Sequence, residues 1–279
     1  MEGTRMISRS ELQRLAKRRK VALGTLEKDY ILTEVLKSLP RVPSLRDLLI
    51  FKGGTALRKV YFSRWRYSED LDFTVRQNMT GQQLRKALGE WYLQVERESQ
   101  IQLTTRMLHK PDGYARIRTR FLGPLSYPGM IFMDLSFDEP LCLVPESRRL
   151  LTAPFLDGER EVLTYPLEEL LAEKMRSLLE RGKSRDYYDV WRLLKEQSSE
   201  LDFALLGTVL PKKLRHKGLS LHNVSDLLPR DAGGLKRYWE EDLEQQVTSL
   251  PPLEQALKEL REMLDKLVAP HLTFAVNDV

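Results

Sequence analysis

The stretch from Leu49 to Val75 limits the possible folds of this chain more than any other part of it. An apolar run from Leu48 to Phe51 has the length and composition of a short buried strand. Gly53 and Gly54 interrupt this run, and apolar residues at helical spacing then continue as far as Tyr61. The stretch therefore predicts a strand, a glycine bend and a helix, followed by a second strand that ends near Val75.

The second strand carries Asp70 and Asp72 in alternation with Leu71 and Phe73. Residues two apart in a strand face the same side, so we expect the carboxylates to share one face while the apolar side chains enter the core. Two close carboxylates repel each other unless a cation lies between them, and Mg²⁺ with phosphate oxygens as further ligands suits that position. The glycines let a phosphate approach the backbone, and the helix that follows offers free N–H groups. The pattern predicts a site for a nucleoside triphosphate and a metal ion. Two solvated acids on a surface hairpin are the alternative.

These residues resemble the signature of the polymerase-β-like nucleotidyltransferase superfamily, in which Gly-Gly or Gly-Ser/Thr is followed by Asp-apolar-Asp. Here 14 residues separate Thr55 from Asp70, a slightly long spacer. The blocks Lys52-Gly-Gly-Thr55 and Arg66-Tyr-Ser-Glu-Asp-Leu-Asp72-Phe are similar specifically to the AbiEii branch, whose relatives include the MenT toxins. The resemblance covers most of residues 25–195 and implies the toxin half of a type IV toxin–antitoxin pair.

The composition is that of a globular protein, with 279 residues, of which 42% are hydrophobic and 30% charged. The single cysteine, Cys142, excludes an internal disulfide, and with only four scattered His it also excludes a Cys/His zinc cluster. No apolar run approaches the ~20 residues of a membrane span and no apolar signal core follows the N-terminus, so we expect a cytoplasmic protein. The net charge of +5 and pI near 9.2 suit an anionic partner such as RNA, although many ordinary proteins share them.

Apolar spacing elsewhere predicts an α/β (α+β) protein. We expect helices at residues 8–20, 25–39, 80–98, 167–181 and 253–268, and a further one capped by Ser184. Strands are expected at Ile101–Leu108, Tyr114–Leu122 and Met130–Phe137. The predicted architecture is a polymerase-β-like nucleotidyltransferase domain with a mixed sheet and N-terminal helices, residues 1–165, followed by a helical C-terminal domain, residues 166–279. The active site would lie in a cleft between the two domains.

Charged residues inside apolar patterns give further candidates. Lys28 and Asp29 continue the apolar face of the second helix, which suggests a mutual ion pair or a place at the rim of the site. Asp134 lies within an apolar strand, where a lone carboxylate is costly to bury. Superfamily members place a third carboxylate beside the Asp-x-Asp strand as a base or second metal ligand, and the resemblance assigns that role to Asp134; a carboxylate turned to solvent is the alternative.

Three arginines, Arg116, Arg118 and Arg120, alternate along one predicted strand and so share a face. They suit RNA or nucleotide phosphates, or equally a charged, protected sheet edge. Short basic clusters at residues 211–217 and 236–239 could also bind RNA, although a solvated loop and core packing of Trp239 are the more ordinary interpretations.

The helical half supplies a second group of candidates. Lys174 lies on the apolar face of its helix, where it would either extend to solvent or meet an anion. The AbiEii-like pattern has a lysine here that would contact the nucleotide phosphates. The block Arg185-Asp-Tyr-Tyr-Asp189 also resembles the family, and Asp186 flanks the core face more closely than Asp189 does. The resemblance implies that Lys174 and Asp186 act with Asp70 and Asp72; a salt bridge at the helix start is the alternative for Arg185 and Asp186.

The predicted reaction is Mg²⁺-dependent transfer of a nucleotide to a hydroxyl group, with the ion on Asp70 and Asp72. The triphosphate would be held by a larger set of residues: Lys52, Gly53, Gly54, Thr55 and Lys174, with Arg66 and Ser68 orienting phosphates. By resemblance the acceptor is RNA, at tRNA 3′ ends, so that blocked aminoacylation arrests translation and a cognate antitoxin is implied. Two other classes stay open: transfer to a small molecule or a protein side chain, and a non-catalytic module that binds RNA or a partner.

Overall fold

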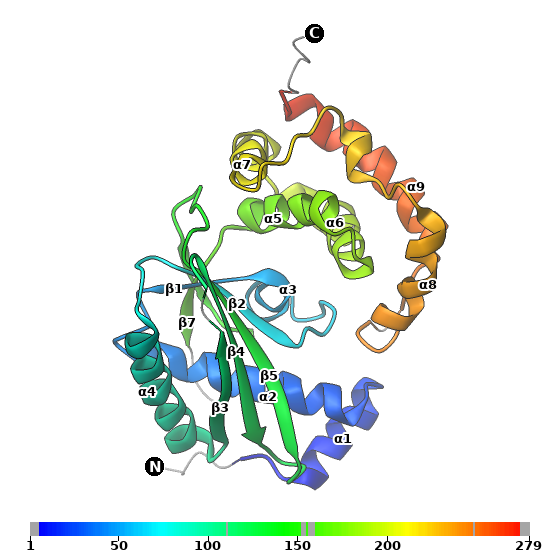
Figure 1. The fold of residues 1–279 in the computed structure, drawn as a ribbon. Helices are drawn as coiled ribbons and strands as arrows, with labels where there is room; N and C mark the ends of the chain where they lie inside the picture. The colour runs from blue at the N-terminus through cyan, green and yellow to red at the C-terminus, as the bar shows by residue number, and fades with distance from the viewer. Residues whose placement is uncertain (1–5, 110, 152–154, 156–159, 248, 274–279) are drawn as a thin grey trace. The chain divides into compact units, whose positions relative to one another are not determined.

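The computed structural model describes residues 6–109, 111–151, 155, 160–247 and 249–273 of the chain. These residues form two compact units, Met1–Glu139 with Pro145–Thr164, and Pro140–Val144 with Tyr165–Val279. Figure 1 shows the helices and strands of both units, which are described separately below.

The first unit is built on one mixed sheet, formed in the described residues by seven strands in the order β3-β4-β5-β2-β1-β7-β6. The β2–β5 and β1–β7 pairs are parallel and the other pairs antiparallel. The bounds are β1 (Leu49–Lys52), β2 (Asp70–Val75), β3 (Gln102–His109), β4 (Tyr114–Leu122), β5 (Pro128–Ser136), β6 (Glu146–Arg149) and β7 (Glu161–Thr164). The predicted strands are confirmed to within about two residues, as is the α/β class with a mixed sheet.

Helices α1 (Arg9–Arg19), α2 (Leu23–Ser38) and α4 (Gly81–Ser99) belong to the same unit. A capping box formed by Ser8 and Glu11 begins α1. Helices α2 and α4 pack against each other and against strands β5 and β3 respectively (Figure 1). Trp91 of α4 joins them, because its buried indole Nε1 donates to Val35 O at 3.0 Å and to Ser38 Oγ at 2.9 Å. Its ring also meets Phe73 of β2, at 6.1 Å between centroids.

The helices therefore cover one face of the central strands. On β2 and β5 the buried residues Leu71, Phe73, Met133 and Leu135 alternate with half-buried ones, which are Asp70, Asp72, Phe132 and Asp134. We call the opposite side, which carries those half-buried residues, the open face of the sheet. The charged residues that the sequence singled out on β2, β4 and β5 all lie on it.

The second unit is helical, as predicted. Its helices are α5 (Leu167–Glu180), α6 (Ser184–Gln197), α7 (Phe203–His216), α8 (Ala232–Leu243) and α9 (Leu253–Met263), with a π-helical turn at Leu264–Val268. Helix α6 contacts α5, α8 and α9 (Figure 1). Trp239 packs in the core, as its ordinary interpretation predicted.

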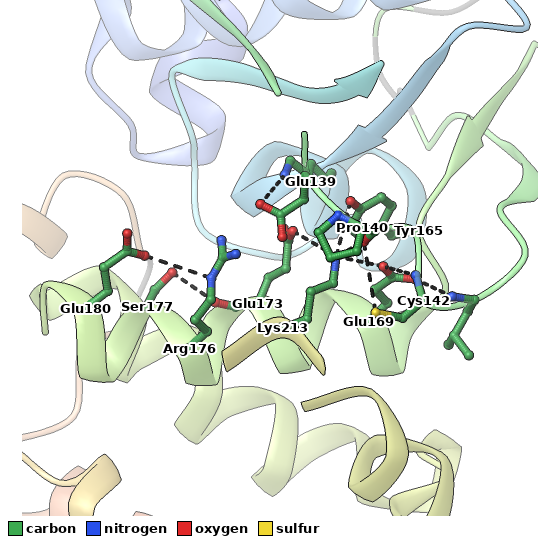
Figure 2. A network of polar contacts seen from close by, with 12 residues as sticks. Glu139, Pro140, Cys142, Tyr165, Glu169, Glu173, Arg176, Ser177, Glu180 and Lys213 are labelled. Carbon is green, nitrogen blue, oxygen red and sulfur yellow. Dashed lines mark hydrogen bonds and ion pairs between the residues drawn. The ribbon is translucent and has the colours of Figure 1, made fainter. Parts of the chain in front are cut away.

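Two local predictions for this unit were wrong. Ser184 is the first residue of α6 and not its N-cap: Lys183 is at the cap position, and the buried Ser184 hydroxyl has no hydrogen-bond partner in the described part of the chain. The basic cluster at residues 211–217 is not a loop, because most of it belongs to α7. Lys213 within it is fully buried among Glu169, Glu173 and the Pro140 carbonyl (Figure 2).

Among the helices in the described part of the chain, none combines the length and the apolar character that crossing a membrane requires.

Candidate active site

The two carboxylates of β2 lie side by side on the open face. Asp70 and Asp72 are half-buried, and the residues that alternate with them, Leu71 and Phe73, are buried. In the strand register, Asp72 is opposite Lys52 of β1 on one side and Asp134 of β5 on the other. Opposite residues of neighbouring strands project to the same face, so three carboxylates share this part of the sheet.

A glycine bend brings the backbone against this carboxylate pair. Strand β1 ends at Lys52, and helix α3 (Gly53–Ala56) begins directly and continues as a π turn, η2 (Leu57–Tyr61). Gly53 has φ +78°, and a Cβ atom added there would lie 2.1 Å from Asp72 Oδ2. A side chain at this position would therefore be strained and would overlap the carboxylate.

The segment before β2 closes over the second glycine. A Cβ atom added at Gly54 would lie 2.8 Å from Arg66 Nη2 and 3.3 Å from Ser68 Oγ. Arg66 is buried, and its Nη1 donates to Tyr67 O at 3.2 Å. The bend thus lies between the Asp72 carboxylate on one side and a guanidinium and a hydroxyl on the other, which is a suitable environment for a charged phosphate chain.

Thr55 and Lys52 are in less open positions than the sequence suggested. The buried Thr55 hydroxyl donates to Asp70 O at 2.5 Å, so it fastens the bend to β2. Lys52 is also buried, with Nζ 3.9 Å from Glu139 Oε2. Their predicted contacts to a nucleotide stay predictions.

Asp134 has partners that the sequence did not reveal. Its side chain is 21% exposed, its Oδ1 accepts a hydrogen bond from the Tyr114 hydroxyl, and Arg116 Nε lies 3.8 Å away. Burial, and then the Asp134 carboxylate, raise the pKa of Tyr114, so the tyrosine remains the donor. Tyr114 could have been found from its spacing, since it precedes Arg116 by two residues on one strand.

The donor set suits a metal ion that takes part of its coordination from a substrate. Within the described residues, no three His, Cys, Asp or Glu side chains are grouped closely enough to hold a metal ion by themselves. Mg²⁺ is commonly held by one or two carboxylates together with substrate phosphates and water. Asp70 and Asp72 fit that pattern, because both are oxygen ligands on one face beside the glycine bend.

A buried charge cluster joins α2 to η2, the turn that follows the glycine bend. Asp29 of α2 accepts from Arg58 Nε at 2.9 Å and from Lys59 Nζ at 2.7 Å. Although burial raises the pKa of Asp29, the two cations outweigh it and the pKa is lowered. Of the two alternatives for Lys28 and Asp29, the mutual ion pair was wrong: Lys28 pairs with Glu69 at 2.5 Å, and Glu69 directly precedes Asp70 in the chain.

The candidates of the second unit form a cluster of their own. Lys174 Nζ lies 2.8 Å from Asp189 Oδ2 and 3.6 Å from Asp186 Oδ1, and all three residues are buried. Arg181 donates to Asp186 through Nε at 2.8 Å and Nη2 at 2.9 Å. Burial raises the pKa of Asp186, but Arg181 and Lys174 more than offset this and lower it. Asp189, which the helical wheel disfavoured, is the nearer partner of Lys174, while the action of Lys174 and Asp186 with Asp70 and Asp72 stays a prediction.

Comparison with known proteins decides the family. The family model "Nucleotidyl transferase AbiEii toxin, Type IV TA system" matches residues 35–266. The chain belongs to the AbiEii family of nucleotidyltransferase toxins. Among solved structures, it is similar to MenT4, a nucleotidyltransferase toxin from Mycobacterium tuberculosis H37Rv, with a TM-score of 0.71 at 18% identity over 95% of this chain and 92% of that one. A search among curated proteins found no match.

Membership of the AbiEii family confirms the recognition made from the glycine bend and the Asp-x-Asp strand. This AbiEii protein is an enzyme, a nucleotidyltransferase, and the toxin of a type IV toxin–antitoxin system. The family implies a nucleoside triphosphate as substrate, typically with a divalent metal ion, and an antitoxin as partner. The similarity to MenT4 confirms the fold.

Proposed function

We propose that this AbiEii protein transfers a nucleoside monophosphate from an NTP to RNA, at the 3′ ends of tRNA, in the cytoplasm, and that the modified tRNA can no longer support translation. The observation that carries the proposal is the position of the Asp72 carboxylate directly over the Gly53 bend. Phosphates and a metal-binding carboxylate are needed at the same place for this chemistry, and a backbone without a side chain lies directly beside the carboxylate here.

In the proposed reaction Asp70 and Asp72 would hold Mg²⁺, and the bound ion would supply neutralisation of the charge on the triphosphate and on the departing pyrophosphate. The Gly53-Gly54 backbone admits the phosphate chain, and Arg66 and Ser68 donate hydrogen bonds to it. Asp134 accepts the proton of the attacking hydroxyl. Tyr114 and Arg116 fix the orientation of the Asp134 carboxyl group through their contacts with its Oδ1. Lys174 and Asp186 of the second unit are proposed to contribute to the same site.

Radiolabelled transfer tests this proposal directly. The purified protein is incubated with MgCl₂, total tRNA and each α-labelled NTP in turn, with and without EDTA. We expect label at the tRNA 3′ end in the presence of Mg²⁺ only. In the variant Asp72→Asn the rate should fall by at least about 100-fold, because a neutral amide is a poor ligand and stabilises less charge.

The matched control is Asp112→Asn, an exposed aspartate in a turn of the same unit, which should transfer at the wild-type rate. Circular dichroism of both variants should match the wild type. Label on a protein or small molecule in place of tRNA would remove the RNA acceptor from the proposal. Full activity of the Asp72→Asn variant would remove the metal site.

A further inference from the structure

The register of the sheet connects the carboxylates to the arginines of β4. Across the strands one row of opposite residues runs Lys52, Asp72, Asp134, Arg116 and His109. A second row runs Asp70, Phe132, Arg118 and Met107, and a third pairs Met130 with Arg120 and Thr104. All these residues lie on the open face, so the surface next to Asp70 and Asp72 carries Arg116, Arg118, Arg120, Met130 and Phe132, which we name the arginine face.

Protection of a sheet edge does not explain these arginines. The sheet order places β4 between β3 and β5, so its hydrogen-bonding groups are already paired on both sides. That alternative from the sequence was therefore wrong. The Arg116 side chain pairs with Asp134, whereas within the described residues the side chains of Arg118 and Arg120 form no ion pair or hydrogen bond. Both side chains are exposed.

The geometry of the arginine face fits a regularly charged strand that also presents bases. Alternate residues of a strand are about 7 Å apart along the backbone, so the three arginines start from evenly spaced positions on one face. Phe132 is half-buried beside this row, and the Arg116 guanidinium lies 4.8 Å from its ring centroid. Cations that track a backbone and an aromatic ring that stacks a base are the two parts of single-strand recognition.

The face is also continuous with the proposed site. Phe132 is the direct neighbour of Asp70 in the register, and β4 is two strand spacings, about 10 Å, from β2. A nucleic-acid strand lying on the arginines would therefore end at the carboxylates. We propose that the arginine face binds the single-stranded acceptor end of RNA, with Arg118 and Arg120 on backbone phosphates and Phe132 under a base. This inference rests on the proposed function, because it names where the RNA acceptor lies.

Binding can be measured separately from transfer. Fluorescence anisotropy of a labelled single-stranded RNA of about 12 nucleotides, without NTP, gives Kd over a series of salt concentrations. For Arg118→Gln/Arg120→Gln we expect Kd to rise about tenfold and the slope of log Kd against log salt to fall by about 1.4, since two phosphate contacts are lost. In transfer assays the KM for RNA should rise while the KM for NTP stays unchanged.

Matched variants test whether RNA binding depends on the arginine face or only on the overall positive charge of the protein. Arg85→Gln/Arg97→Gln removes two exposed arginines of α4, which packs on the covered face, and should leave Kd and the salt slope unchanged. Phe132→Leu should weaken RNA binding at least fivefold, because only an aromatic ring can stack a base. Phe132→Tyr keeps an aromatic ring and should bind RNA as tightly as the wild type. Equal effects of the two arginine pairs, or an unchanged salt slope in Arg118→Gln/Arg120→Gln, would overturn the inference.

The outcomes also separate this inference from the proposed function. Transfer to tRNA with an unaltered KM for RNA in Arg118→Gln/Arg120→Gln keeps the function and rejects the surface. Binding that depends on the arginine face, with label found only on other acceptors, keeps the surface and rejects the function.

Discussion

At Gly53 the backbone lies directly against one of the candidate metal ligands, Asp72. The Gly53 φ of +78° is unfavourable for any other residue, and a Cβ atom would overlap Asp72 Oδ2 at 2.1 Å. We therefore expect Gly53→Ala to lose at least about tenfold in transfer rate and about 1–3 kcal/mol in stability, from strain and a displaced carboxylate. Steady-state kinetics and thermal unfolding check this.

Gly89→Ala is the matched control, since Gly89 is exposed within α4 and a Cβ there meets nothing within 4 Å. It should leave transfer unchanged and raise stability by about 0.5–1 kcal/mol, because alanine is the better helix former. If Gly53→Ala transferred as fast as this control, the transfer rate would not depend on the position of the Asp72 carboxylate beside Gly53.

For single residues, the sequence predicted the face on which a side chain lies better than the residue that it contacts. The alternation of Asp70 and Asp72 with apolar residues follows from the two-residue period of a strand, and the structure confirms it. The donor to Asp134 is Tyr114, and the partner of Lys28 is Glu69, 41 residues along the chain. Such pairs depend on which strands and helices become neighbours, which periodicity alone does not encode.

Among the elements, the turn η2 connects the buried charge cluster to the segment over the bend. Arg58 donates to Asp29 and to Trp65 O, and its guanidinium lies 3.7 Å from the ring centroid of Tyr67. It therefore fixes the residues on both sides of Arg66. If Arg66 holds the triphosphate as proposed, Arg58→Lys should raise the KM for NTP about tenfold, the cost of one misplaced charged hydrogen bond of about 1.5 kcal/mol.

The KM for RNA should not change in Arg58→Lys, and this selectivity is what distinguishes a positioning role from general destabilisation. Arg76→Lys, an exposed residue just after β2, serves as the comparison and should leave both KM values at the wild-type level. Equal increases in the two KM values of Arg58→Lys would contradict the positioning role.

Helix α9 packs against α6, and its Glu259 carboxylate accepts hydrogen bonds from two residues of α6. Glu259 Oε2 accepts from Trp191 Nε1 at 2.8 Å and from Lys195 Nζ at 2.7 Å, and Oε1 accepts from Gln255 at 2.9 Å. The hydrogen bond from Gln255, followed by those from Lys195 and Trp191, lowers the pKa of Glu259 from 4.5 to about 2.

Because the folded-state pKa is the lower one, this stabilisation is complete above pH 4.5 and is lost as the pH falls towards 2. Glu259→Gln should therefore flatten the fall of Tm with pH in that window, while lowering Tm at pH 7. Unfolding followed by tryptophan fluorescence measures both. Glu262→Gln, exposed on the same helix, should keep the wild-type profile; a wild-type slope in Glu259→Gln would exclude this linkage.

The elements themselves were largely predictable, because strong periodicity and turn residues mark them. Helix α4 begins at Gly81 and the long strands β4 and β5 lie within about two residues of expectation. The exceptions have local causes. A proline at 211 and five nearby basic residues indicated a loop, yet Leu206, Leu210 and Leu214 pack as one helical face and the helix continues through the proline.

At the scale of the whole molecule, the chain passes between its two units more than once. Residues 140–144 belong to the second unit although the residues on both sides belong to the first. The segment is attached to α5 and α7: Glu169 accepts from Cys142 N and Leu143 N, each at 2.9 Å, and Lys213 Nζ donates to Pro140 O at 2.7 Å (Figure 2). No local pattern in the sequence marks such an excursion, since it depends on Glu169 and Lys213, which lie far along the chain.

Lys213 is central to this attachment. Its fully buried ammonium group lies 2.7 Å from Glu169 and 3.3 Å from Glu173, and 4.6 Å from the ring centroid of Tyr165. Lys213→Met would leave two carboxylates without their shared cation in a buried place, so we expect a loss of about 3–5 kcal/mol in unfolding free energy. Hydrogen exchange of the Cys142 and Leu143 amides should become faster, because their acceptor Glu169 would turn towards water. Urea unfolding and exchange mass spectrometry measure the two effects.

Lys212→Met, the exposed neighbour on the same helix, should change neither the unfolding free energy nor the exchange of these amides. If exchange at residues 142–143 were the same in both variants, Lys213 would stabilise the helices without holding the segment that returns the chain to the first unit.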